Sequence, residues 1–428
     1  MGNDLMNNQD NNIYDKNLAV MMLTHNHYQT VDEILGKNLE YYHKYNIDVY
    51  VCDDSDDEGK TKGVVEDYQK KGFDNVFFSP VTDTDDGNEK YFRAVRQDYT
   101  NKKYKYVFPI KDRAYFSERI IKSVSEIAQD DFDVIMVVQD FDRWNVHLPE
   151  IKYIYNDAVE FFEHYGQLTT NWRTMVFNTS TIANAHNLDK FNRTYHLGAA
   201  SNFAQPIITF AGLAEIANPR INVIHAVGSK DIGESVEFNS GSGWFKMVFE
   251  LWLDRWIKAI YSLPSIYNQY KPTIIKAETN LNVLFGSVDG LKYHKYLGTL
   301  TKEVFDKYRP NWRMVSNVPE KWVDYIINDQ DHELIIDIFK QLHKCLQNRD
   351  YENAFYIVVN NKWLKEVVVD YEIVLSEFEN YRFELYLFRK SERMDGVESL
   401  PDLVKKARDR ETKEKRTTDI SESQEQSE

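Results

Sequence analysis

Acidic and polar side chains follow two short apolar runs of this sequence at the point where each run ends. Residues 24–27, which read Thr-His-Asn-His, come after the apolar run 18–23, and Asp53 and Asp54 come after the run 49–52. In an open α/β sheet, ligands bind outside the carboxyl ends of the strands, where carboxylates can accept hydrogen bonds, hold a cation or abstract a proton. The alternative is a solvated turn in which an Asp or Ser caps the next helix.

The same pattern recurs after two later apolar runs. The run 104–110 is followed by residues 111–113, which read Lys-Asp-Arg, and the β-branched run 132–138 is followed by residues 139–142, which read Gln-Asp-Phe-Asp. Because the carboxyl ends of parallel strands meet at one edge of a sheet, we expect these polar tips to converge. This convergence predicts an active site.

Strand and helix patterns alternate in the part of the chain that carries these tips. Short apolar runs at 18–23, 48–52 and 76–78 are separated by helical patterns at 30–45 and 61–71. This alternation is typical of a parallel sheet with right-handed crossovers. Further strands are predicted at 104–110, 132–138, 174–177 and 221–224. We therefore expect an α/β fold with a mostly parallel, Rossmann-like sheet flanked by helices.

The second half of the chain predicts helices. Residues 243–257 have the spacing of an amphipathic helix, and the pattern stays helical after Pro264. The loop 228–243 holds four glycines and is either a mobile lid or a long surface connection. We expect four segments: a disordered segment at 1–16, an α/β domain at 17–265, an α-helical region at 266–403 and a disordered charged tail at 404–428. The helical region would extend the core or form a homo-oligomer contact.

The composition argues against several classes of protein. A net charge of −16 disfavours general binding to nucleic acid or to an anionic bilayer. The two cysteines, Cys52 and Cys345, are too few for a disulfide framework, so we expect both to be reduced. The polar residues 1–12 do not resemble a secretory signal, and no apolar run reaches the length of a membrane span. We expect a cytoplasmic protein with no transmembrane segment.

Residues 1 to about 260 resemble the GT-A fold glycosyltransferases of family 2. The first strand of those enzymes ends in Thr-x-Asn or a similar turn, matched here by Thr24 and Asn26. Their second strand ends in an Asp-Asp-Gly-Ser type of turn, matched by residues 53–56, which read Asp-Asp-Ser-Asp. The resemblance implies that the base and ribose of a sugar nucleotide contact Thr24, Asn26, Asp53 and Asp54.

In that family a later strand ends in an Asp-x-Asp motif that holds a divalent metal, Mn or Mg, on the diphosphate. The matching segment here is Lys111, Asp112 and Arg113, so only the middle carboxylate is kept. The resemblance implies Asp112 as the metal ligand, with Lys111, Arg113 and Arg93 as counter-charges to the diphosphate. We hypothesise that Lys111 or Arg113 takes over part of the metal's role, as fixed cations can. The competing metal motif is residues 140–142, one strand later than the family's position, and this order favours Asp112.

An inverting member of the family uses an Asp or Glu to deprotonate the acceptor hydroxyl. The usual Glu-Asp pair is absent between residues 178 and 209. The candidates for the catalytic base are Asp140, Asp142 and His196, although a lone His is more often structural than catalytic.

The resemblance implies an inverting glycosyltransferase of the hexosyltransferase type. It would move a sugar from a nucleotide donor, a UDP-sugar, to a hydroxyl of a glycan or glycoprotein in bacterial cell-surface glycan synthesis. Its partners would be the nucleotide sugar and the acceptor. One alternative is a nucleotidyltransferase, which usually has a glycine-rich first loop that residues 24–27 lack. The other is a catalytically inactive GT-A-like binding or scaffold protein.

Overall fold

The computed structural model describes most of the first 276 residues and a smaller share of the remaining chain. The described ranges are 14–56, 59–82, 86–139, 152–182, 203–226, 231–234, 247–276, 298–316 and 318–328, with residues 291, 294, 295, 341 and 353.

The described residues form one large sheet of eight strands in the order β3-β2-β1-β4-β8-β6-β9-β7. β1, β2, β3 and β4 are parallel, as are β6 and β9, whereas β8 is antiparallel to both of its neighbours and β7 is antiparallel to β9. The expected α/β class with a mostly parallel sheet is confirmed. The strands are β1 (Lys16–Thr24), β2 (Asp48–Asp53), β3 (Val76–Pro80), β4 (Tyr104–Lys111), β6 (Val134–Gln139), β7 (Ile154–Tyr155), β8 (Met175–Asn178) and β9 (Ile221–Ala226).

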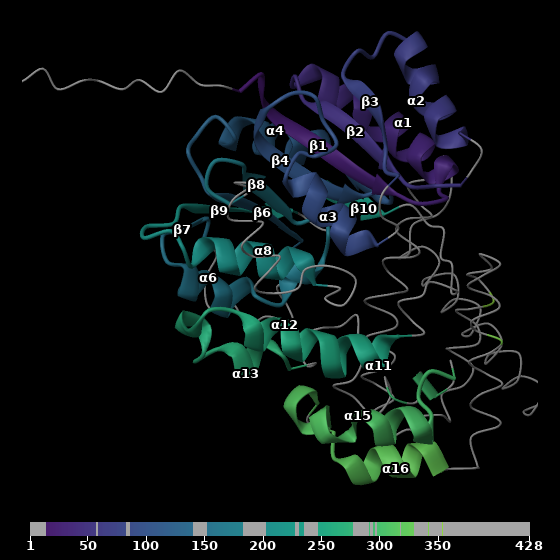
Figure 1. The fold of residues 1–428 in the computed structure, drawn as a ribbon, viewed down its shortest axis with the longest axis vertical. Coiled ribbons are helices and arrows are strands. Elements are labelled where there is room, and N and C mark those ends of the chain that lie inside the picture. The colour runs from purple at the N-terminus through teal and green to yellow at the C-terminus, as the bar shows by residue number, and fades with distance from the viewer. Residues whose placement is uncertain are drawn as a thin grey trace, which may run out of the picture. The chain divides into compact units, whose positions relative to one another are not determined.

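Helices cover both faces of this sheet, which is why its central strands are continuous apolar runs. α1 (Tyr28–Lys44), α2 (Lys60–Lys70) and α4 (Glu118–Ile127) pack on one face, and their apolar side chains share a core with alternate residues of β1 and β2. α3 (Gly87–Val95) and α8 (Ala204–Leu213) lie on the other face (Figure 1). The hydroxyl of Tyr91 on α3 donates to Gln205 Oε1 on α8 at 2.7 Å, which joins these two helices.

Two segments differ in detail from the sequence-based expectation. The strand predicted at 174–177 is β8, and it runs against its neighbours in an otherwise parallel region. The amphipathic helix predicted at 243–257 is described from residue 247 on and is not one regular helix. α11 (Val248–Glu250) continues through a π-helical turn, Leu251–Arg255, into α12 (Trp256–Ser262).

Part of the glycine-rich loop is a strand. β10 (Ile232–Glu234) pairs antiparallel with β5 (Ala114–Phe116), the short strand after β4. Next to it, the hydroxyl of Ser117 donates to Asp231 Oδ1 at 2.6 Å, and Arg119 forms an ion pair with the same carboxylate. Of the predicted loop 228–243, the remaining residues lie outside the described part of the chain.

The chain divides into two compact units, one of residues 1–237 and 250–280 and the other of residues 238–249 and 281–428. The first unit holds the sheet, together with α6 (Ala158–Tyr165) and α13 (Lys271–Ile274). The second holds α15 (Lys302–Val315) and α16 (Glu320–Asn328), which are joined by Arg309 Nη1 donating to Asp324 Oδ2 at 3.0 Å. No helix in the described ranges has the length and apolar character needed to cross a bilayer. Cys52 is a free, buried thiol whose pKa is raised by burial, and Cys345 lies outside the described residues.

A buried carboxylate organises the amino-terminal edge of the central strands. Asp48, the first residue of β2, is fully buried and accepts hydrogen bonds from Lys16 Nζ at 2.6 Å and Lys102 Nζ at 2.8 Å. It also accepts one from the Tyr104 hydroxyl at 2.6 Å. Burial opposes ionisation of Asp48, but these hydrogen bonds outweigh that penalty and lower the pKa of its carboxyl group. The cluster therefore ties β2 to β1 and β4.

Replacing this carboxylate should destabilise the protein in a pH-dependent way. We expect Asp48→Asn to lower the free energy of unfolding at pH 7 by about 2–3 kcal/mol, because two lysines lose their counter-charge in a buried setting. Because the pKa of Asp48 is lowered by folding, its contribution is present above the unfolded pKa of about 4 and is lost as the pH falls below that value. Urea unfolding at pH 7 and at acid pH measures both effects.

The matched control is Asp67→Asn, which removes an exposed carboxylate that pairs with Lys70 on the surface of α2. This change should leave stability nearly unaltered. An Asp48→Asn variant as stable as the Asp67→Asn variant at pH 7 would contradict the role given to Asp48.

Candidate active site

The order of strands reverses at the boundary between β1 and β4. From β1 the chain moves outward on one side to β2 and β3, and then returns to the other side of β1 as β4. Ligands of open α/β sheets bind outside the carboxyl ends of the strands at such a switch point. The registers pair Thr24 with Asp53 and Leu23 with Lys111, so the three strands end nearly level. The loops after these strands therefore meet.

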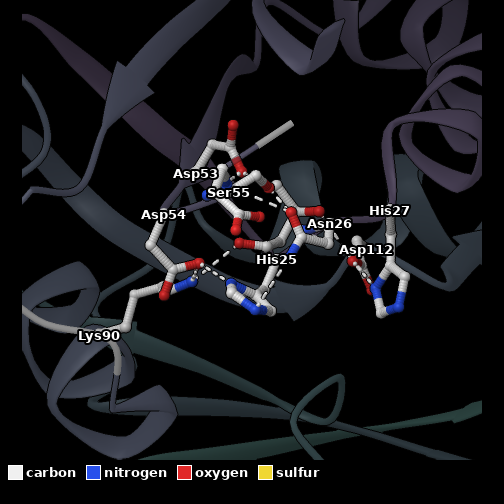
Figure 2. Close-up of polar contacts among 10 residues, drawn as sticks. His25, Asn26, His27, Asp53, Asp54, Ser55, Lys90 and Asp112 are labelled. Atoms are coloured by element: carbon white, nitrogen blue, oxygen red, sulfur yellow. Dashed lines mark hydrogen bonds and ion pairs between the residues drawn. The ribbon is translucent and has the colours of Figure 1, made fainter. Parts of the chain in front are cut away.

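The loops after β1 and β2 are joined by a set of short hydrogen bonds (Figure 2). The backbone N–H of Asn26 donates to Ser55 Oγ at 2.6 Å, and the backbone N–H of Asp56 donates to Asn26 Oδ1 at 3.2 Å. Asp53 Oδ1 accepts from the Ser55 backbone N–H at 3.0 Å, and also from the Ser55 hydroxyl. Asn26 has a left-handed backbone with φ of 57°, which Asn tolerates better than most residues. The two loops thus form one polar surface.

A buried ion pair lies beside these loops. Lys90 on α3 is 4% exposed and contacts Asp54 Oδ1, and its ammonium group also donates to the Thr24 carbonyl at 2.8 Å. His25 Nδ1 lies 3.1 Å from the same Asp54 oxygen. Figure 2 shows Lys90, Asp54 and His25 side by side. One lysine therefore links α3 to the ends of both β1 and β2.

A second group of charges surrounds Asp112, directly after β4. Asp112 is 6% exposed, and its Oδ2 accepts from the Thr24 hydroxyl at 2.8 Å and lies 2.9 Å from His27 Nδ1. On the other side of the His27 ring, Nε2 lies 3.2 Å from Arg113 Nη2. One oxygen of this carboxylate thus contacts a hydroxyl and an imidazole at the switch point.

Most of the residues implied by the resemblance lie in this region. Thr24, Asn26, Asp53, Asp54, Asp112 and Arg113 are brought together by the contacts above, and Lys111 is the last residue of β4. Arg93 lies on α3, where its Nε donates to Glu89 Oε1 at 2.9 Å. The candidate bases Asp140, Asp142 and His196 lie outside the described residues, so their roles stay predictions.

Sequence reasoning missed Lys90, and it gave no role to His25, His27 or Ser55. A signal for Lys90 was present. Lys90, Tyr91, Ala94 and Val95 are all buried and share one helical face, so the lysine stands where an apolar residue is expected. A lysine on a buried face needs an anionic partner, and Asp54 provides it.

The described residues do not fit the predicted metal site. A divalent cation on a diphosphate needs several hard oxygen ligands. The described part of the chain holds no group of three His, Cys, Asp or Glu that could bind a metal ion. Asp112 contacts a hydroxyl and an imidazole instead of a second acid.

No model of a protein family matches this chain, and neither does any curated protein. Similar solved structures include TarS 1–349 from S. aureus, with 14% identity over 69% of this chain and 89% of that chain, at a TM-score of 0.39. The mannosyltransferase PcManGT from Pyrobaculum calidifontis, in complex with GDP-Man and Mn2+, is 13% identical over 72% of this chain and 85% of that chain, at a TM-score of 0.37. The third is 4-diphosphocytidyl-2C-methyl-D-erythritolsynthase from Anaerococcus prevotii, 12% identical over 50% of this chain and 91% of that chain, at a TM-score of 0.32.

One of these three structures is a mannosyltransferase. Because all three TM-scores are below 0.5, these likenesses carry no further argument.

The buried ion pair yields a prediction about stability. We expect Lys90→Met to lower the free energy of unfolding by about 3 kcal/mol, because it leaves the Asp54 carboxylate buried beside an apolar side chain. The double variant Lys90→Met with Asp54→Asn should recover part of that loss, since no uncompensated charge then remains. Urea unfolding of the single and double variants gives the coupling energy.

Lys70→Met on the exposed surface of α2 is the matched control and should change stability little. If Lys90→Met were no more destabilising than Lys70→Met, the ion pair would not be the link between α3 and the strand ends.

Proposed function

We propose that this protein is a glycosyltransferase that transfers a sugar from a uridine diphosphate sugar to a hydroxyl group of a glycan or glycoprotein. One observation at the switch point of the sheet carries the proposal. The two joined polar loops after β1 and β2 meet there with a separate cluster, after β4, that contains Arg113. Polar loops suit a base and ribose, and a guanidinium suits a diphosphate.

The base, the ribose and the diphosphate of the donor each have a candidate partner. The loops that carry Asn26, Asp53 and Asp54 offer the carboxylate and amide groups that recognise a ribose hydroxyl or the N–H of a uracil. The end of β4 supplies Lys111 and Arg113 to oppose the charge of the diphosphate.

The reaction follows from the donor's chemistry. An acceptor oxygen attacks the anomeric carbon, the bond from that carbon to the diphosphate oxygen breaks, and UDP leaves with the bonding electrons. In the inverting reaction that we propose, one base takes the acceptor's proton as this happens. Fixed positive charge near the leaving oxygen stabilises the developing charge with little reorganisation. A role in bacterial cell-surface glycan synthesis in the cytoplasm would agree with the resemblance that the sequence carries.

Nucleotide binding tests the donor class. We expect UDP and UDP-sugars to raise the melting temperature of the wild type more than adenine or guanine nucleotides do, because a ligand that binds only the folded state stabilises it by mass action. Asn26→Gly should reduce this shift, because it removes the side-chain amide of the first loop, fits the left-handed backbone and leaves no buried charge unpaired. Asp67→Asn is the control. The absence of a shift with every nucleotide would favour a glycan-binding or scaffold protein, and a shift with the nucleoside triphosphate alone would favour a nucleotidyltransferase.

Substitution of the three candidate bases tests the reaction. Alanine at the true base among Asp140, Asp142 and His196 should lower kcat by roughly 10²- to 10⁴-fold, because general base catalysis contributes about that much. The nucleotide-induced thermal shift should be retained. Turnover of UDP-sugars by each variant gives the rate, and NMR of the product's anomeric proton gives the stereochemistry. Retention of configuration, or three variants with full activity, would contradict an inverting base at these positions.

A further inference from the structure

The Asp112 carboxylate is placed to accept hydrogen bonds and not to bind a metal cation. Its Oδ2 accepts the Thr24 hydroxyl at 2.8 Å and lies 2.9 Å from His27 Nδ1, and the carboxylate is almost fully buried. Its two sequence neighbours, Lys111 and Arg113, are cations. A metal ion at this carboxylate would have to compete with both hydrogen bonds and with these charges.

Hydrogen-bond chemistry favours one tautomer of a neutral His27 ring. Arg113 Nη2 lies 3.2 Å from His27 Nε2, and a guanidinium can only donate. Nε2 must therefore be the accepting nitrogen, and the proton of the neutral ring lies on Nδ1. From Nδ1 it is donated to Asp112 Oδ2 at 2.9 Å. The hydrogen bonds run in one direction, from Arg113 through His27 to Asp112.

We propose that this chain of hydrogen bonds positions Arg113 to bind the donor's diphosphate, and that the site binds the diphosphate without a divalent cation. Asp112 is then a positioning residue that acts through His27, and not a metal ligand. A guanidinium is planar and always charged, so a bond to His27 orients a fixed cation that can form charge-assisted hydrogen bonds to phosphate oxygens. The proposal rests on the proposed function, because it takes the donor to be a nucleoside diphosphate sugar.

Calorimetry of UDP binding to the full chain tests the proposal. The wild type should bind UDP with affinities that agree within about threefold in EDTA and in manganese chloride. In EDTA, Arg113→Met should weaken UDP binding by roughly 10- to 100-fold, because it removes charge-assisted hydrogen bonds. Arg113→Lys should restore part of this loss. Lys122→Met, which removes an exposed cation on α4, is the charge-matched control and should bind UDP as the wild type does.

Uridine, which has no phosphate, separates this proposal from the proposed function. Ligand-observed NMR should show that uridine binds the wild type and Arg113→Met alike, which also shows that the variant is folded. If UDP bound the wild type tightly only with manganese, the metal-free site would be wrong and the proposed function would stand. If neither uridine nor UDP bound the wild type, both proposals would fall.

The positioning role of Asp112 has its own spectroscopic signature. Long-range ¹⁵N–¹H spectra of histidine-labelled protein should show His27 as the Nδ1–H tautomer, with His27→Phe assigning the signal by its loss. Asp112→Asn should weaken that preference, and His27→Phe should weaken UDP binding but not uridine binding. A His27 ring protonated on Nε2 at neutral pH, with Asp112 intact, would contradict the proposed series of hydrogen bonds from Arg113 through His27 to Asp112.

Discussion

The ion pair between Lys90 and Asp54 is the interaction on which the candidate site depends. Both side chains are buried, and taking two charges out of water is costly unless they are paired in good geometry. Lys90 also donates to the Thr24 carbonyl, so a shift of α3, of the β1 end or of the β2 end would leave a buried charge without its partner. The geometry of the polar loops follows from that constraint.

The two edges of the central strands use carboxylates in different ways. At the amino edge, Asp48 accepts from two lysines and a tyrosine hydroxyl, and these bonds lower its pKa. These three donors bind the protein's own carboxylate, which makes the cluster a structural joint between β1, β2 and β4. At the carboxyl edge, the donors around Asp112 include a histidine and an arginine in series. An arginine stays positively charged when it donates to a neutral ring nitrogen, so its charge can still attract an anionic ligand.

This difference bears on how a fold of this class can bind a diphosphate. Metal ions and arginines both neutralise phosphate charge, but a metal needs a cage of oxygen ligands, whereas an arginine needs only to be oriented. Compared with the Asp-x-Asp motif of the family that the sequence resembles, the segment 111–113 has cations in place of the outer acids. The remaining acid is buried and faces His27, where it can orient a neighbouring base but is poorly placed to bind an ion from solvent.

The sequence by itself determined the fold class and seven of the eight strands of the large sheet, but not β7 or the small β5–β10 pair, and it pointed to the edge at which the candidate site lies. Strands covered on both faces must be apolar throughout, so β1, β2, β4 and β6 stand out, and the polar residues after them mark the carboxyl edge. An apolar run has no direction, however, so the antiparallel setting of β8 could not be predicted from its residues. The partners of Lys90 and Asp112 also came only from the tertiary structure, because Lys90 and Thr24 are 66 residues apart and Thr24 and Asp112 are 88 apart. The hydrophobic periodicity of the sequence indicates which side chains are buried. Which buried charges contact each other depends on the tertiary structure.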